Sequence, residues 1–185
     1  AYFAYPEIDP AVYGIHCNML PTTDTGWGSD ASIVPPVIHG PVFIGAGDLS
    51  GCEWSSSQLN PYRSFQPVKP VASIDYGVFV YQGSFAVPQA AALSRVQHAG
   101  ELLRQHHPQQ ALVLAREAAS LDPGDLFAET SLGDAASATG QTEEARTAFE
   151  SAILRAKRLS PDAQKLYLPD LQAKLSKLPA ATASR

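Results

Sequence analysis

Apolar and polar residues follow two different patterns along this chain. In residues 1–88 the apolar runs are short, rich in β-branched and aromatic residues, and interrupted by proline and glycine, which is typical of strands joined by tight turns. In residues 89–178 the apolar positions recur at a helical spacing among alanine, leucine, glutamine, glutamate and arginine, which favour helices. We therefore predict a β-rich domain over 1–88, a helical domain over 89–178 and a frayed tail over 179–185.

The β-rich domain is expected to be built from short strands. Several short strands with frequent turn residues favour an antiparallel sandwich or a small barrel, and we predict a sandwich-like domain. The predicted strands are Tyr2–Tyr5, Ala31–Val34, Val37–His39, Pro41–Gly45 and Ser73–Tyr81, of which the last has the clearest pattern.

The helical domain is divided by residues that start or stop helices. Pro88 and Pro108 stand where helices are expected to begin, and Gly140 stands where one is expected to end, in a turn that suits a positive φ. Pro169 is expected to kink the last helix. The predicted helices are 89–105, 108–121, 125–138, 142–158 and 162–177.

Small residues recur in this domain when the chain is aligned on itself with a shift of about 34 residues. Such residues allow helices to approach closely enough for their side chains to interlock. The matched positions are Ala99 with Gly133, Ala111 with Ala145, and Ala118 with Ala152.

This pattern resembles the tetratricopeptide repeat family over residues 91–158. The resemblance implies two helical hairpins, with 162–177 as a capping helix. Departures are His98 where the family has leucine, His106-His107-Pro108 where a turn glycine is usual, and a longer second copy. The alternative is an unrelated pair of alanine-rich hairpins. The predicted fold class is thus α+β, an antiparallel β-sandwich-like domain packed on an α-α superhelix of two such hairpins plus the capping helix.

The same resemblance suggests where a partner would bind. In this family the first helix of each hairpin lines a concave face that contacts proteins or peptides. Two repeats bury little core by themselves, so we expect the β-rich domain to cover the first helix and form one packed unit. A plain solvated face is the alternative. The implied partner-binding residues are Val96, Leu103, Arg104, Thr130, Asp134 and Ser137.

A second, weaker resemblance lies in the β-rich domain. The order of its motifs is similar to the extracytoplasmic C-terminal domain of bacterial membrane glycosyltransferases related to the dolichyl-phosphate-mannose mannosyltransferases. The resemblance implies an extracytoplasmic location and a parent protein tethered by a membrane-embedded N-terminal region, but no activity for this piece. The motifs are Tyr2–Tyr5, Asp9-Pro10, Tyr13–Ile15, Leu20-Pro21, Val42–Gly51, Pro61-Tyr62, Pro70 and Ile74–Tyr81.

The charged residues argue against several partners. The formal net charge is −5, and no basic stripe is present, so neither nucleic acid nor an anionic membrane surface is expected to bind. No apolar run approaches the ~20 residues of a membrane span.

No catalytic, metal or cofactor site emerges from the residue pattern. Gly45–Gly51 has the wrong glycine spacing for a dinucleotide loop and favours a turn. The adjacent His16 and Cys17 point to opposite faces of a strand, and the spacing of His98, His106 and His107 does not converge on one ion. We expect no enzyme and no cofactor.

Two further readings stay open at this stage. Aromatic rings in the β-rich domain are candidates for stacking on a sugar, which makes a carbohydrate-binding module the alternative to a partner-contacting protein. Cys17 and Cys52 either form a disulfide or remain two buried thiols, and we favour the thiols. The candidate glycan-binding residues are Trp27, Trp54 and Tyr62.

Overall fold

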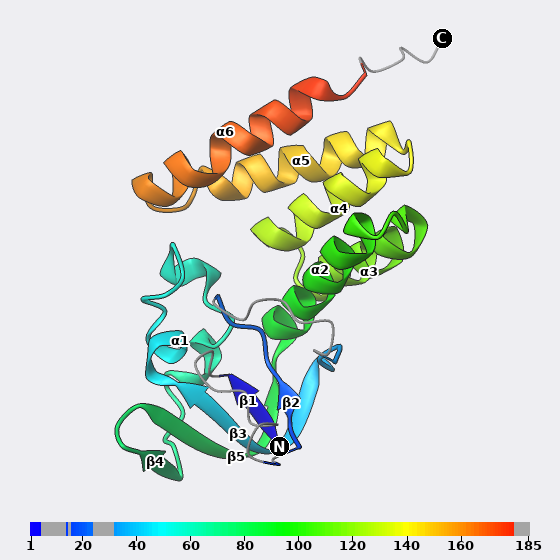
Figure 1. Cartoon of the computed structure of the whole chain (residues 1–185). Helices are drawn as coiled ribbons and strands as arrows, with labels where there is room; N and C mark the ends of the chain where they lie inside the picture. Colours follow the sequence, from blue (N-terminus) through cyan, green and yellow to red (C-terminus); the bar gives the residue numbers. More distant parts are fainter. Residues whose placement is uncertain (5–13, 15, 24–31, 180–185) are drawn as a thin grey trace. The chain divides into compact units, whose positions relative to one another are not determined.

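The computed structural model describes residues 1–4, 14, 16–23 and 32–179. The chain divides into two compact units, residues 1–94 and 95–185 (Figure 1). Unit 1 holds a mixed β-sheet and unit 2 holds helices, so the fold is α+β. The predicted tail, from residue 180 onward, lies outside the described residues.

The strands described in unit 1 form one mixed sheet in the order β2-β1-β3-β5-β4. Strand β1 (Tyr2–Ala4) runs parallel to β2 (Asn18–Met19) and to β3 (Val37–Gly45). Strand β5 (Val78–Ala86) runs antiparallel to β3 and to β4 (Ala72–Ile74). The prediction of an antiparallel sandwich was therefore wrong for this part of the chain, because a strand's residue pattern reports which face is buried and not which direction its neighbour runs.

Four of the predicted strands need correction. The predicted strands Val37–His39 and Pro41–Gly45 are one strand, β3, which continues through Gly40 with its φ of +104°. Residues 32–34 form no strand. The predicted strand Ser73–Tyr81 is a hairpin, in which β4 and β5 are joined by a turn at residues 75–77.

The core of unit 1 lies on one face of this sheet. Val42, Ile44 and Tyr81 alternate toward that face and are at most 2% exposed. The ring of Phe65 packs against two rings of β5, with its centroid 5.0 Å from that of Tyr81 and 4.9 Å from that of Phe85. Aromatic pairs at such distances add to the stability that burial provides.

The segment that follows β3 is held by a buried asparagine. After β3 the chain forms a short helix, α1 (Ala46–Ser50), where the sequence predicted a turn. The Asn60 side chain donates to the Leu49 carbonyl at 3.2 Å and accepts from the Tyr62 N–H at 2.8 Å. Gly51 ends α1 with a φ of +81°, and a Cβ there would lie 2.9 Å from Asn60 Nδ2. Glycine suits this position on both counts.

Unit 1 also includes the first turns of helix α2 (Pro88–Arg104). Ala90, Ala91 and Leu93 are buried there. Ser94 Oγ accepts a hydrogen bond from the Val34 N–H at 3.0 Å and donates to the Ala91 carbonyl at 2.9 Å. The β-rich part thus covers the start of this helix, while the expectation of one packed unit over the whole chain stays a prediction.

Unit 2 contains the remaining helices at their predicted places. They are α3 (Pro108–Leu121), α4 (Leu126–Ala138), α5 (Thr142–Ala156) and α6 (Pro161–Lys177). Gly140 has a φ of +77° in the turn between α4 and α5, as predicted. The helix α6 continues through Pro169 to its end.

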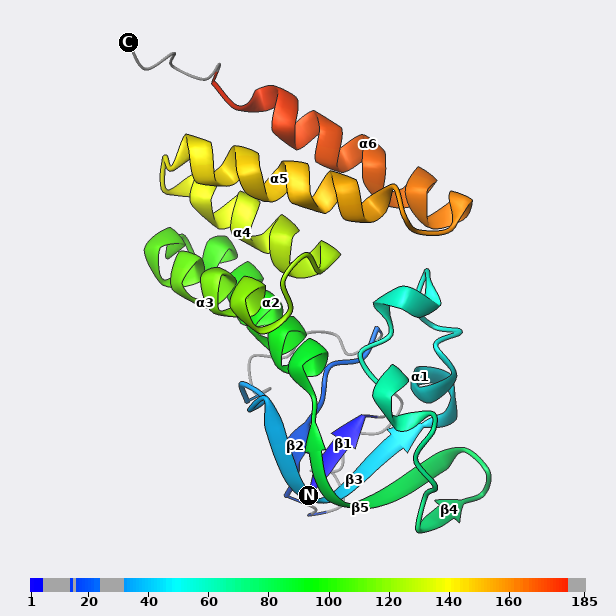
Figure 2. The same ribbon diagram turned by 180° about the vertical axis from the view of Figure 1, so that it is seen from behind.

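Close helix contact occurs where the small residues recur. Ala99, Ala111 and Ala145 are fully buried, and a Cβ on Gly133 would lie 2.4 Å from the ring of Phe149. Helix α4 packs against α3 and α5, and α5 packs against α6 (Figure 2). Gly133 therefore has the close-packing role that its spacing predicted, and the three alanines are buried.

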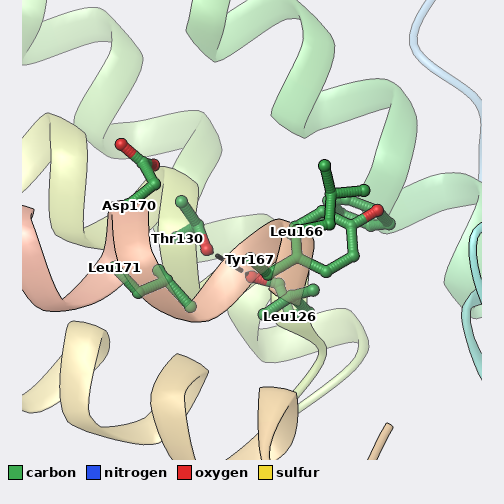
Figure 3. Close-up of a pocket in the computed structure, with 7 residues that line it drawn as sticks. Leu126, Thr130, Leu166, Tyr167, Asp170 and Leu171 are labelled. Atoms are coloured by element: carbon green, nitrogen blue, oxygen red, sulfur yellow. Dashed lines mark hydrogen bonds between the residues drawn. The ribbon is translucent and has the colours of Figure 1, made fainter. Parts of the chain in front are cut away.

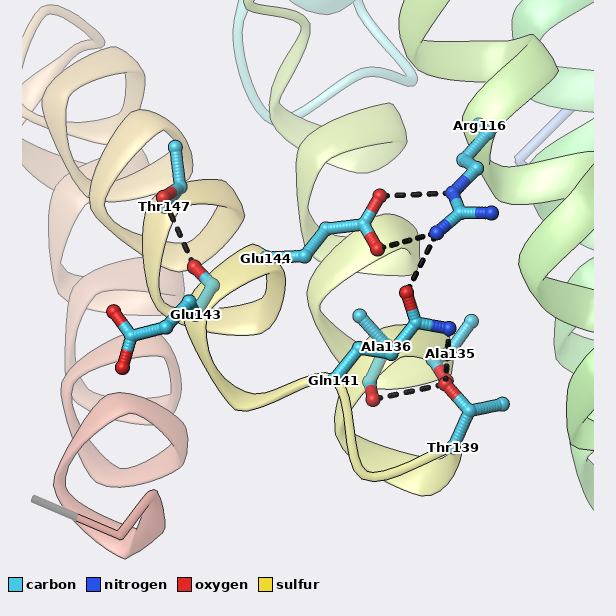
Figure 4. A network of polar contacts seen from close by, with 8 residues as sticks. All are labelled: Arg116, Ala135, Ala136, Thr139, Gln141, Glu143, Glu144 and Thr147. Carbon is cyan, nitrogen blue, oxygen red and sulfur yellow. Dashed lines mark hydrogen bonds and ion pairs between the residues drawn. The ribbon is translucent and has the colours of Figure 1, made fainter. Parts of the chain in front are cut away.

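An ion pair joins α3 to the start of α5. Arg116 donates to both carboxylate oxygens of Glu144, from Nε at 2.8 Å and from Nη2 at 2.7 Å (Figure 4). The same Nη2 donates to Gln141 Oε1 at 2.7 Å. The hydrogen bonds from Arg116 favour the carboxylate more than burial disfavours it, and they lower the pKa of Glu144.

This ion pair predicts a pH-dependent contribution to stability. A carboxyl group whose pKa is lower in the folded state stabilises the fold above its unfolded pKa, about 4.3 for glutamate, and loses that effect as the pH falls through the folded pKa. We expect Glu144→Gln to destabilise the chain at pH 7 and to match wild type in more acid solution. Urea titrations at several pH values measure this, with Glu150→Gln on the exposed side of α5 as control. A difference that persists unchanged below the folded pKa would contradict it.

Candidate functional site

Unit 2 has an open cavity of about 310 Å³ between α4 and α6. Its walls are mostly apolar and aromatic, and its polar groups are the hydroxyls of Thr130 and Tyr167 and one carboxylate (Figure 3). We call it the α4/α6 pocket. Its lining residues are Leu126, Phe127, Thr130, Leu166, Tyr167, Asp170 and Leu171.

The pocket wall on α4 is positioned by the helix cap. Asp125 is the N-cap of α4, and its carboxylate accepts from the N–H groups of Phe127 and Ala128 at 2.9 Å each. Such a cap satisfies backbone donors that the helix leaves unpaired. Because residues three and four apart share a helix face, Thr130 lies beside Leu126 and Phe127.

The pocket wall on α6 comes from residues at the same helical spacing. Leu166 and Asp170 are four residues apart, as are Tyr167 and Leu171. The rings of Tyr167 and Phe127 meet edge to face across the two helices, with centroids 5.8 Å apart and an interplanar angle of 85°. Leu171 is 2% exposed, whereas Leu166 is 60% exposed, so the pocket has a packed floor and an open rim.

Charged residues lie at one side of the pocket. Lys174 on α6 bonds Asp134 on α4 at 2.8 Å and Asp170 at 3.3 Å. Burial raises the pKa of Asp134, and the hydrogen bond from Lys174 offsets only part of that effect. Burial works to lower the pKa of Lys174, but the hydrogen bond to Asp134 and the charges of both carboxylates raise it overall. Two carboxylates therefore share one cation here.

The predicted partner-binding residues of α4 lie at different distances from the pocket. Thr130 lines the pocket, and Asp134 lies one turn further along α4 in the ion pair with Lys174. Ser137 is exposed near the end of α4. The pocket residues of α6 were missed, although their four-residue spacing was visible in the sequence.

The predicted residues of α2 do not line the pocket. Val96 and Leu103 are half-buried, and the exposed Arg104 pairs with Glu101 on the same helix at 2.6 Å. The structure thus brings α4 and α6 together at one site and leaves the residues of α2 apart from it.

The candidate glycan-binding rings do not form an exposed platform. Trp54 is 7% exposed and Tyr62 is fully buried. The Tyr62 hydroxyl donates to the Pro21 carbonyl, and burial, with a smaller effect from the charge of Asp48, raises the pKa of Tyr62. Trp27 lies outside the described residues.

Among the described residues, the remaining candidates for metal binding or thiol chemistry do not form a site. In residues 1–4, 14, 16–23 and 32–179, no three metal-ligating side chains gather in one place. Both cysteines lie in the described chain and no disulfide joins them; Cys17 is half-buried and Cys52 is exposed rather than buried as predicted. His106, which stands where the repeat family usually has a turn glycine, has a φ of +62° just after α2.

Neither a membrane-spanning helix in the described residues nor a similarity to known proteins was found. Among the described helices, none has the length and apolar character that crossing a bilayer requires. Models of known protein families, curated proteins and solved structures were compared with the chain. None of them matches.

Proposed function

We propose that this chain is a non-catalytic protein that binds a peptide segment of a partner at the α4/α6 pocket. The observation that supports the proposal is the pocket itself, an open apolar cavity whose lining includes Thr130, one of the residues that the repeat resemblance implies for partner binding. The proposed architecture of unit 2 is two tetratricopeptide hairpins, α2 with α3 and α4 with α5, followed by α6 as a capping helix.

The size and lining of the pocket suit side chains of a peptide. Pockets for small molecules usually measure about 300–1,000 Å³, so a cavity of about 310 Å³ stands at the small end of that range. Its polar groups are the Asp170 carboxylate at the rim, the Tyr167 hydroxyl, and the Thr130 hydroxyl, which already donates to the Leu126 carbonyl at 2.7 Å. Apolar anchors entering such a pocket supply most of the affinity of a peptide complex.

The cellular location of the chain and its parent protein are a separate part of the proposal. The ordered motifs of the β-rich part support an extracytoplasmic location, next to a membrane glycosyltransferase of which this chain would be the C-terminal region. In that setting the helical unit would position the enzyme against another protein. Carbohydrate binding is not favoured by the described residues, because Trp54 and Tyr62 are buried.

A matched pair of leucine variants tests the role of the pocket. We expect peptides selected from a random library on the wild-type chain to bind Leu166→Asn about tenfold or more weakly, because an apolar wall of the anchor pocket is lost. Leu154→Asn is the control, since Leu154 is 58% exposed on α5, close to the 60% of Leu166, and lies outside the pocket. Fluorescence anisotropy of the labelled peptides gives the Kd values. Equal binding to both variants would sink the proposal.

A further inference from the structure

We infer that the peptide segment bound at the α4/α6 pocket is basic, with a bulky aliphatic or aromatic anchor in the pocket and a lysine or arginine close to it that contacts Asp170. This inference rests on the proposed function and names the chemistry of its partner. It follows from the charges around the pocket and from the geometry of Asp170.

Asp170 is the ionisable side chain that directly lines the pocket and has capacity for another cation. Its carboxylate is 3.3 Å from Lys174 Nζ, whereas Asp134 holds that same Nζ at 2.8 Å. Its side chain is 66% exposed, compared with 35% for Asp134. A carboxylate can accept about four hydrogen bonds, so a second cation can reach Asp170 from the pocket mouth without displacing Lys174 from Asp134.

The charges near the pocket sum to a negative value. Asp170 lines the pocket on α6, and Asp134 lies beside it on α4. Both carboxylates pair with Lys174. Two carboxylates thus stand against one cation. On the outer part of α6, Lys165 and Asp162 pair with each other at 3.1 Å and leave this balance unchanged.

This negative charge favours a basic peptide over an acidic one. Complementary charge at the rim of an interface speeds association and rejects partners of the wrong sign. An acidic peptide would place its carboxylates against Asp170 and Asp134, which already share one cation. A basic peptide gains a charge-assisted hydrogen bond at Asp170.

The apolar part of the segment follows from the pocket walls. Phe127 and Tyr167 meet edge to face, and Leu126 and Leu171 form the floor at 1% and 2% exposure. A cavity of about 310 Å³ lined in this way accepts a leucine, phenylalanine or tryptophan side chain, which stays dry while the adjacent cation remains in contact with water at the rim. The anchor and the cation therefore recognise two adjoining surfaces.

The experiment is a selection of random peptides on the full chain, followed by affinity measurements with variants of the chain. We expect enriched peptides that carry a lysine or arginine near a large apolar residue. Asp170→Asn should weaken these peptides by up to about fivefold, the range of an exposed ion pair, and raised salt should reduce that difference. Asp162→Asn is the matched control, on the same helix, 93% exposed and outside the pocket, and it should change little.

The other outcomes separate this inference from the proposed function. Peptides that depend on Leu166 but are acidic or uncharged would overturn the basic partner and leave the pocket as a binding site. Peptides that bind Leu166→Asn as tightly as wild type would overturn both the inference and the proposed function. Concentration-dependent self-association in sedimentation experiments, abolished by Leu166→Asn and retained in Leu154→Asn, would show that a second copy of the chain occupies the pocket and would also overturn the inference.

Discussion

Replacing Phe149 with alanine is expected to lower the free energy of unfolding by about 3–5 kcal/mol, the range for large aromatic residues removed from a packed core. Phe149 lies on α5, is 1% exposed, and touches the backbone of α4 at Gly133. The loss combines apolar area returned to water with a cavity that two helices cannot close by a small shift. Urea denaturation followed by far-UV circular dichroism measures it as a lower midpoint.

The control for this change is an exposed leucine on the same helix. Leu154 is 58% exposed on α5, so Leu154→Ala should change the free energy of unfolding by at most about 0.5 kcal/mol. Equal effects of Phe149→Ala and Leu154→Ala would mean that α4 and α5 are not packed through Phe149.

The second large effect is expected from adding a single methyl group to Gly133. A Cβ at this position would lie 2.4, 2.5 and 2.8 Å from three atoms of the Phe149 ring. Since that ring is 1% exposed, it has little room to move away. Although alanine is the better helix former, overpacking of this kind usually costs about 1–3 kcal/mol, and we expect Gly133→Ala to destabilise the chain. The same urea titration measures the effect.

A second glycine provides a control of opposite sign. Gly100 lies in α2, and a Cβ there would have no atom within 4 Å. Gly100→Ala should therefore stabilise the chain by about 0.5–1 kcal/mol through helix propensity alone. In addition, Phe149→Leu should cost less in the Gly133→Ala background than in wild type, because the smaller side chain makes room for the methyl group. Strict additivity of the two changes would contradict the contact.

The helices show how far local residue patterns can carry a prediction. The interval 108–121 matches α3, and the other helices begin and end within a few residues of their predicted bounds. Their ends coincide with residues that act locally, such as Pro108 at the start of α3 and Gly140 after α4. Local sequence was sufficient here because proline and glycine change the backbone of their own residue.

The β-hairpin shows where the same reasoning failed. The turn between β4 and β5 gives Asp75 and Tyr76 φ angles of +46° and +56°. A positive φ at both central residues belongs to a tight hairpin turn, which usually carries asparagine or glycine there. Because tyrosine favours strands, the residue pattern over 73–81 predicts a single strand.

The α4/α6 pocket was predicted in part. The repeat resemblance implies Thr130 and Asp134 on α4 as partner-binding residues. It does not point to Tyr167 and Asp170 on α6, which line the pocket. A helix over 162–177 is predicted by the sequence, and α6 occupies that interval. The face that α6 turns toward α4 depends on how the helices cross, which the spacing of residues within α6 does not determine.

The residue pattern alone predicted two parts of different structure, the places of the helices, and the small residue Gly133 at which α4 touches α5. The folded chain alone decided that β1 runs parallel to β3, that 73–81 forms a hairpin, and that α4 and α6 enclose a cavity. The physical reason is the range of the interactions involved. Caps, turns and helix periods depend on residues within a few positions of each other, whereas strand direction and cavity walls depend on contacts between segments far apart in the chain.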